Sequence, residues 1–233
     1  MTSDVDRRWQ VRTADTDRRG PLDYSDFSVV RDLLRTRLYG TTSLGDGVRR
    51  VIAPGLVQRV VIDRPHTVVP VTYDMLARWP IGEWELFELA EQHVRGDGGV
   101  HIVRDRFDRL PWADDLPRVA LLTGPEYLTA HARWLGDHAI GGPEGAVLTM
   151  PSKEAIYAYP VLGAEVVRSI ELLALLAALH TADPWPINSH VYWWRPGSLE
   201  LAATTRQRED TIVISPTDVY RRNLARFESG ESP

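Results

Sequence analysis

The stretch His190–Ile214, HVYWWRPGSLELAATTRQREDTIVI, decides the fold class. Much of it alternates between apolar and polar side chains, which is the period of a β-strand. Three strands are predicted at 190–195, 199–203 and 211–214. Pro196-Gly197 supplies a tight turn after the first strand, and the polar run 204–210 joins the second to the third. Strands joined in this way predict an antiparallel β-meander.

The segment directly before the meander predicts a helix over residues 164–180. In its second half apolar side chains occupy nearly every side. A helix of this kind is buried on most of its faces. We therefore expect it to lie beneath the meander, at the centre of the fold.

The rest of the chain mixes short strands and helices. Because they do not follow strict βαβ alternation, the predicted fold class is α+β, with a mixed or antiparallel sheet, a buried central helix and flanking helices. Residues 1–20 are charged and poor in large apolar side chains, so we expect a mobile arm, then a single domain over 21–228 and a tail over 229–233. Strands are predicted at 48–52, 56–62, 68–71, 118–123, 146–150 and 156–161, and helices at 25–39 (stopped by Gly40), 72–79, 83–95, 125–135 and 215–227.

Composition limits the function classes. The 233 residues include no cysteine, which excludes disulfides and thiolate metal sites. The net charge is −5 and the pI about 5.8, and no basic face of the kind that nucleic acid requires is evident. The most apolar stretch, 170–179, is shorter than the roughly 20 residues that cross a bilayer. We expect a cytoplasmic protein with no cofactor, whose partner is neither nucleic acid nor membrane.

The first strand of the meander is unusually aromatic. Alternation places residues 190, 192 and 194 on one face and 191, 193 and 195 on the other. Since only one face of an antiparallel sheet needs to be buried, either one tryptophan lies near the surface beside arginines, or both faces are covered. Exposed aromatic and arginine side chains together are typical of protein interfaces. The candidate binding surface consists of Tyr192, Trp193, Trp194, Arg195, Arg206 and Arg208.

A second interpretation is a cleft built from His93, Ser152, Lys153 and His190. His93 lies on the apolar stripe of the helix 83–95, either as a buried general base or as a core histidine bonded to a carbonyl. Ser152 and Lys153 would form a nucleophile pair. Adjacent residues of an extended segment point to opposite sides, however, which favours an ordinary exposed turn. The enzyme interpretation requires the four side chains to converge.

The remaining histidines do not predict a metal site. His131 and His138 lie two turns apart on the helix predicted at 125–135 and just beyond it, too far to share a metal unless the helix breaks at Gly136. His180, Asp183 and His190 are ligand types that suit zinc or iron, but their spacing is not compact.

Three phrases in the C-terminal two thirds resemble the YtpQ-like family of bacterial domains of unknown function. They are PVTYDMLARWPIGEWELFELAEQHVR (70–95), ALLTGPEYLTAHARWLGD (120–137) and AVLTMPSKEAIYAYPV (146–161). His93 stands where the family usually has asparagine. The resemblance implies a cytosolic α+β domain and carries over no catalytic residue.

The leading hypothesis is a non-enzymatic protein-binding domain, such as an adaptor or an immunity-type protein, that uses the aromatic and arginine face of the meander. The alternative is an enzyme or small-ligand binder with the four-residue cleft. A third possibility is a homodimer formed through an open edge strand of the meander.

Overall fold

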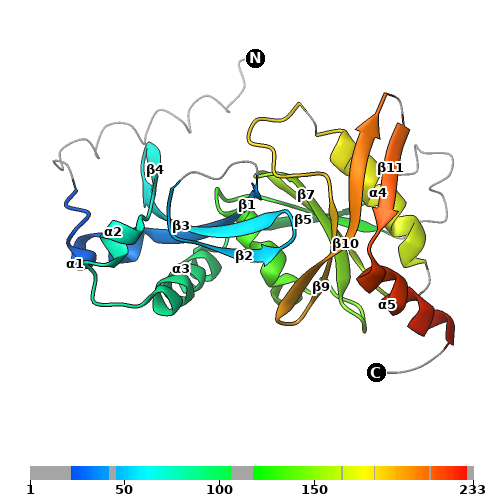
Figure 1. The fold of residues 1–233 in the computed structure, drawn as a ribbon, viewed down its shortest axis with the longest axis horizontal. Coiled ribbons are helices and arrows are strands. Elements are labelled where there is room, and N and C mark those ends of the chain that lie inside the picture. The colour runs from blue at the N-terminus through cyan, green and yellow to red at the C-terminus, as the bar shows by residue number, and fades with distance from the viewer. Residues whose placement is uncertain are drawn as a thin grey trace, which may run out of the picture.

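Two antiparallel sheets with flanking helices form the molecule, which confirms the α+β class (Figure 1). The computed structural model describes residues 22–41, 46–105, 118–163, 165–180, 182–209 and 211–229. The predicted arm 1–20 and residues 230–233 of the predicted tail lie outside this range.

The N-terminal sheet has four strands in the order β1-β3-β2, with β4 also paired to β3. Helix α3 packs on this sheet through Leu86, Ala90 and Val94, which recur at helical spacing and are buried. The elements of this half are α1 (Phe27–Val30), the 3₁₀ turn η1 (Arg31–Leu33), β1 (Leu34–Gly40), β2 (Arg49–Ala53), β3 (Leu56–Arg64), β4 (Thr67–Pro70), α2 (Tyr73–Leu76) and α3 (Glu83–Asp97).

The second sheet has seven strands in the order β11-β10-β9-β7-β8-β6-β5, and every pairing is antiparallel. Strands β9, β10 and β11 are the predicted meander, and β9 and β10 are joined at Pro196-Gly197 as expected. Its elements are β5 (His101–Asp105), β6 (Val119–Thr123), the 3₁₀ helices η3 (Leu128–Arg133) and η4 (Leu135–His138), β7 (Ala146–Ser152), β8 (Ala155–Pro160), α4 (Val166–Ala178), β9 (Val191–Arg195), β10 (Ser198–Arg208), β11 (Thr211–Pro216) and α5 (Asp218–Ser229).

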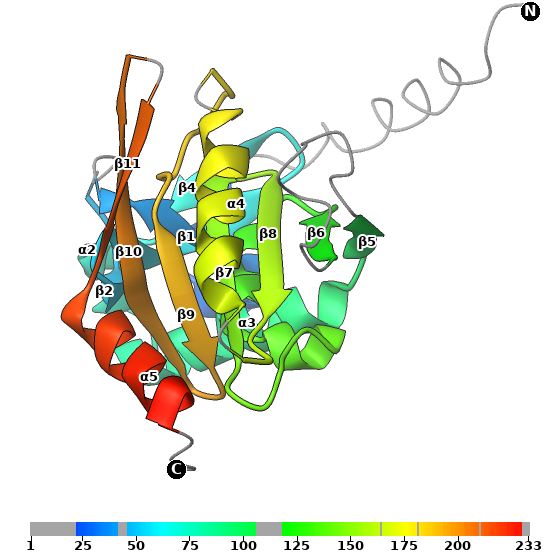
Figure 2. The same ribbon diagram turned by 90° about the vertical axis from the view of Figure 1, so that its right-hand side faces the viewer.

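Both faces of the central strands of this sheet are covered. Figure 2 shows α4 lying across β7, β8 and β9 on one face, where its Ile170 and Leu173 join a core with Trp193. On the other face, β1 and β3 together with η3 and η4 share a second core with the sheet. The buried helix predicted near residue 170 is therefore confirmed, but it covers one of two closed faces.

The helix predicted over 25–39 is wrong in its second part, because only residues 27–33 are helical and the chain continues from Leu34 as strand β1. Leu34 and Leu38 are four residues apart, a spacing that suits both a helix and one face of a strand. Pairing with β3 along the whole length, from Leu34 opposite Ile62 to Gly40 opposite Leu56, decides for the strand. Gly40 is needed for a close approach: a Cβ there would lie 2.3 Å from the carbonyl oxygen of Ile187.

Other elements also differ from the prediction: strand β5 is absent from it, and the helix predicted at 72–79 covers only Tyr73–Leu76. The segment after Pro125 forms two 3₁₀ helices rather than one α-helix. Strand β10 continues to Arg208, because the polar residues predicted as a loop pair with β11. The last helix begins after Thr217, whose hydroxyl accepts from the Tyr220 amide, and not after Ser215.

Candidate functional site

The aromatic side chains of β9 are buried, so the predicted exposed face of the meander is wrong. Trp193 is 1% exposed beneath α4 and α5, and Trp194 is 6% exposed in the core shared with the N-terminal sheet. Tyr192 is fully buried beside Trp194, and its hydroxyl donates to the Pro54 carbonyl at 3.1 Å. The predicted alternation of faces is confirmed, and so is the alternative that both faces are covered.

The three predicted arginines do not form one surface with these rings. Arg195 is half-buried, stacks over the Trp193 ring at 4.8 Å and lies 3.7 Å from a Glu200 carboxylate oxygen. Arg206 and Arg208 are exposed near the other end of β10. Ten residues separate Arg208 from Ser198, the partner of Arg195, which is roughly 33 Å along a strand.

The four residues of the proposed cleft have separate surroundings. His93 donates from Nδ1 to the Leu34 carbonyl at 3.0 Å, the arrangement of an ordinary core histidine. The Nδ1 of His190 accepts from the Thr205 amide at 3.3 Å, and burial lowers the pKa of His190. Among the described residues, no hydrogen bond or ion pair joins any two members of this set.

Ser152 and Lys153 belong to the hairpin between β7 and β8. Ser152 is buried at the end of β7, and Lys153-Glu154 is the two-residue turn. The Lys153 ammonium lies 3.2 Å from both Glu126 carboxylate oxygens. It is therefore engaged by a carboxylate instead of activating Ser152 as a nucleophile. The expected turn is present but differs in detail: Pro151 and Ser152 belong to β7, Lys153 is partly buried and only Glu154 is exposed.

Lys153 also contacts an exposed tryptophan that the sequence analysis missed. Its ammonium lies 5.4 Å from the ring centroid of Trp185, which is 65% exposed. Trp185 stands between Pro184 and Pro186, and its φ of +64° is rare for a bulky residue. We call residues 183–187 the Trp185 turn. Its sequence signal is the Pro-Trp-Pro triplet.

Backbone contacts fix the Trp185 turn against the β7–β8 hairpin. The Lys153 amide donates to the Trp185 carbonyl at 3.3 Å, and the Ile187 amide donates to the Pro151 carbonyl at 2.9 Å. Ser152 and Pro186 form an isolated β-bridge between these bonds. The exposed indole is therefore carried by a loop that is fixed by backbone hydrogen bonds.

At the opposite end of β7, Trp194 borders an open groove of about 620 Å³. The groove lies where the β9–β10 turn faces β2 and the η3–η4 segment. Ala146, at the start of β7, pairs with Trp194, whereas Ser152, at its end, pairs with Pro186. The groove and the Trp185 turn therefore occupy different ends of the sheet.

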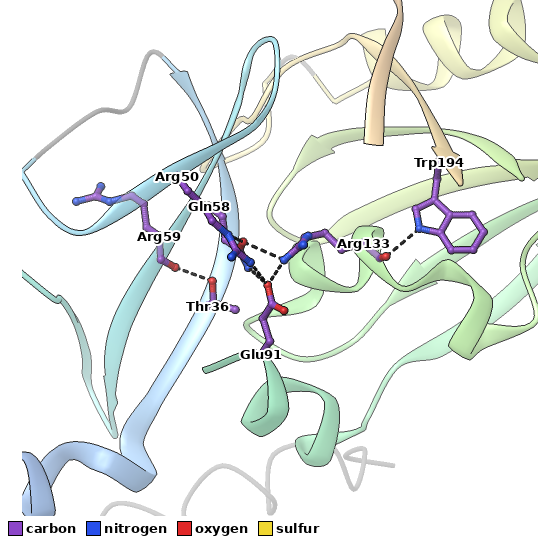
Figure 3. Close-up of polar contacts among 7 residues, drawn as sticks. All are labelled: Thr36, Arg50, Gln58, Arg59, Glu91, Arg133 and Trp194. Carbon is purple, nitrogen blue, oxygen red and sulfur yellow. Dashed lines mark hydrogen bonds and ion pairs between the residues drawn. The ribbon is translucent and has the colours of Figure 1, made fainter. Parts of the chain in front are cut away.

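Arg133, which lines this groove, belongs to a charged cluster (Figure 3). The Glu91 carboxylate oxygen Oε1 accepts from Arg50, from Arg133 and from the Gln58 amide, the last at 2.9 Å. Burial, followed by the like charge of Arg50, lowers the pKa of Arg133 to about 10. The Arg133 carbonyl in turn accepts from Trp194 Nε1 at 2.8 Å.

Two histidine arrangements differ from the sequence expectation. The break between η3 and η4 brings His131 Nδ1 to 3.0 Å from His138 Nε2. Burial and the neighbouring His138 lower the pKa of His131 to about 4. In the described ranges no three histidine, cysteine or acidic side chains gather as a metal site would require.

His180 links Tyr157 to Asp183. The Tyr157 hydroxyl lies 2.7 Å from His180 Nε2, and His180 Nδ1 lies 2.5 Å from Asp183 Oδ2. Burial and the Asp183 charge raise the pKa of Tyr157, which keeps the phenol protonated as the donor. The relay ties β8 to the end of α4, and His190, the third member of the predicted cluster, bonds elsewhere.

Comparisons with known proteins add no assignment. Family models, curated proteins and solved structures each give no match to the chain. The resemblance to the YtpQ-like family therefore stays a prediction. None of the described helices is both long and apolar enough to span a bilayer.

Proposed function

We propose that the protein is a cytoplasmic, non-enzymatic binding domain, of the adaptor or immunity type, and that the Trp185 turn inserts into a partner protein. The observation that carries this proposal is a tryptophan 65% exposed at a φ of +64°. Tryptophan is the residue type most enriched among interface residues whose truncation weakens binding. The exposed aromatic surface expected on the meander is thus replaced by one at the other end of β7.

The backbone of the turn supports recognition. A bulky residue in the left-handed region costs about 1–3 kcal/mol, and such strain gathers at functional positions. Pro184, Pro186 and the bonds to the β7–β8 hairpin hold this conformation in the free protein. A loop fixed beforehand loses little conformational entropy on binding.

Charged side chains border the indole in the manner of an interface rim. Lys153 is paired with Glu126, and Glu126 also accepts from Arg37 at 2.7 Å. Since two cations share one carboxylate, these three groups keep a net positive charge. The exposed indole beside them favours a partner that receives it in an apolar pocket. A rim of paired charges adds specificity more than affinity.

The test begins by identifying the partner. The photo-reactive residue benzoylphenylalanine is placed at position 185 and, as a control, at position 84. Trp84 is a matched site because it is 69% exposed on α3, in the other half of the molecule. We expect a crosslinked protein at position 185 only.

The affinity of the crosslinked partner is then measured by calorimetry. Trp185→Ala is expected to weaken binding at least about 30-fold, the size of an interface hot spot. Trp84→Ala should leave the affinity unchanged. Equal affinities for Trp185→Ala and the parent protein, or a loss confined to Trp84→Ala, contradict the proposal.

The homodimer interpretation is measured in the same samples. Strand β11 pairs only with β10 among the described strands, so its other edge is a possible site for a second copy. Light scattering gives the oligomeric state. A crosslink from position 185 to a second copy of this chain would contradict the proposed foreign partner.

A further inference from the structure

The groove beside Trp194 differs from the Trp185 turn in shape and charge. Its volume of about 620 Å³ lies within the range of small-molecule sites, roughly 300–1,000 Å³. Residues from β2, α3, the η3–η4 segment and the β9–β10 turn surround it, so elements of both sheets form its walls. The residues that matter for the argument are Val51, Arg95, Arg133, Trp134, Asp137 and Trp194.

The charged lining of the groove is cationic on balance. Arg95 and Arg133 are opposed by one carboxylate, that of Asp137. Arg95 Nε lies 3.2 Å from Asp137 Oδ2, so these two charges compensate each other. Arg133 is the remaining charge.

The positive charge of Arg133 is only partly compensated by Glu91. Its partner Glu91 also accepts from Arg50, so two guanidinium groups share one carboxylate oxygen (Figure 3). Burial is the larger cause of the lowered pKa of Arg133, and the positive charge of Arg50 adds to it. The Gln58 side-chain oxygen also accepts from Arg133 at 3.1 Å, and Glu83 and Glu88 act on the charge of Arg50 as well. What Arg133 can offer an anion on the open side is therefore its remaining guanidinium N–H donors.

The apolar part of the lining is also exposed. Val51 is 75% exposed on β2, although most valines of the sheets are buried. The Trp194 ring lies against Gly136, where a Cβ would come within 3.1 Å of it. Since Trp194 is 6% exposed, only a small part of the indole reaches the groove, and glycine at 136 lets the backbone pack against its edge.

We propose that this groove binds a small ligand that carries an oxyanion, a carboxylate or a phosphate, on an apolar body of about one ring. The oxyanion lies at Arg133, since a guanidinium binds such groups with two parallel hydrogen bonds. The apolar body lies against Val51 and the edge of Trp194. The site is independent of the proposed partner surface, because the Trp185 turn is at the other end of β7.

The test uses three probes of similar shape. Benzoate, phenyl phosphate and neutral benzamide are titrated at constant ionic strength into the ¹⁵N-labelled protein. The readout is the indole N–H resonance of Trp194, which donates to the Arg133 carbonyl and is assigned by its loss in Trp194→Phe. We expect a saturable shift with benzoate or phenyl phosphate, and the stronger of the two identifies the oxyanion.

Two outcomes overturn the proposal. One is an equal shift with benzamide, which would show that the charge of the ligand is irrelevant. The other is the absence of a saturable shift with either anion.

Charge variants at Val51 locate the site without disturbing the Arg133 cluster. Val51→Glu is expected to weaken binding of the better anion, and Val51→Lys to strengthen it, each by about two- to fivefold, as for an exposed charge pair. Val103→Glu is the control, on exposed β5 at the far edge of the large sheet. Equal affinities for the two Val51 variants contradict the proposed location, and neither variant should change binding at the Trp185 turn.

Discussion

Trp194 and Trp185 lie beside opposite ends of strand β7, one buried and the other exposed. Trp194 pairs across from Ala146, is 6% exposed and donates its indole hydrogen to the Arg133 carbonyl. Trp185 precedes Pro186, which pairs with Ser152, and is 65% exposed. The N-terminal sheet reaches both ends, since Gly40 and Gly55 lie against Ile187 and Asn188. The two rings differ because Trp194 projects from a strand into the core, whereas Trp185 lies on a loop.

The largest expected difference between the two ends is in stability. Trp194→Ala removes a packed ring from the core and should lower the free energy of unfolding by about 3–5 kcal/mol. Trp185→Ala removes an exposed ring and should change it by less than about 0.5 kcal/mol. Urea denaturation followed by far-ultraviolet circular dichroism measures both, since this signal does not depend on the substituted indole.

Trp84→Ala serves as the control for removing an exposed indole elsewhere, and it should behave like Trp185→Ala. A loss above about 2 kcal/mol for Trp185→Ala would mean that the turn is packed against the molecule. Trp185 would then be a packed residue like Trp194, and the contrast between the two tryptophans would be wrong.

Much of the larger sheet could be predicted from the sequence. The alternation in 190–195 correctly assigned Tyr192 and Trp194 to one face and Trp193 to the other. It could not tell whether each face is covered, because covering depends on residues more than a hundred positions away, such as Leu38 and Leu56. Periodicity in the sequence predicts which face of a strand a side chain is on, but only tertiary packing determines whether another layer covers that face.

The candidate sites were harder to predict for the same reason. The sequence predicts a turn at Lys153, but its contact with Trp185 spans 32 positions. The groove combines Val51, Arg133 and Trp194 from three distant segments. The local signal at this site is a tryptophan between two prolines, which indicates a displayed side chain.

A smaller effect at the Trp194 end is expected from pH. His131 lies there, and burial together with His138 lowers its pKa to about 4, against about 6.5 in an unfolded chain. Between these values the unfolded state binds more protons, so stability falls as the pH decreases. From pH 7 to pH 5 this histidine should remove about 2 kcal/mol from the free energy of unfolding.

Urea denaturation at both pH values measures this loss in the parent protein and in His131→Leu. The variant lacks the titrating group, so its free energy of unfolding should decrease by about 2 kcal/mol less over the same interval. His66→Leu, at an exposed turn, is the control and should keep the parent's dependence on pH. Identical pH dependence in His131→Leu and the parent would show that His131 is not buried as a neutral ring.

The most direct test of the central claim is hydroxyl-radical footprinting of the free protein, with oxidation measured by mass spectrometry at Trp185, Trp193 and Trp194. Oxidation follows the access of solvent to each ring. The structure predicts rapid oxidation of Trp185 and protection of Trp193 and Trp194. Rapid oxidation of either β9 tryptophan together with protection of Trp185 would contradict the account and return recognition to the meander.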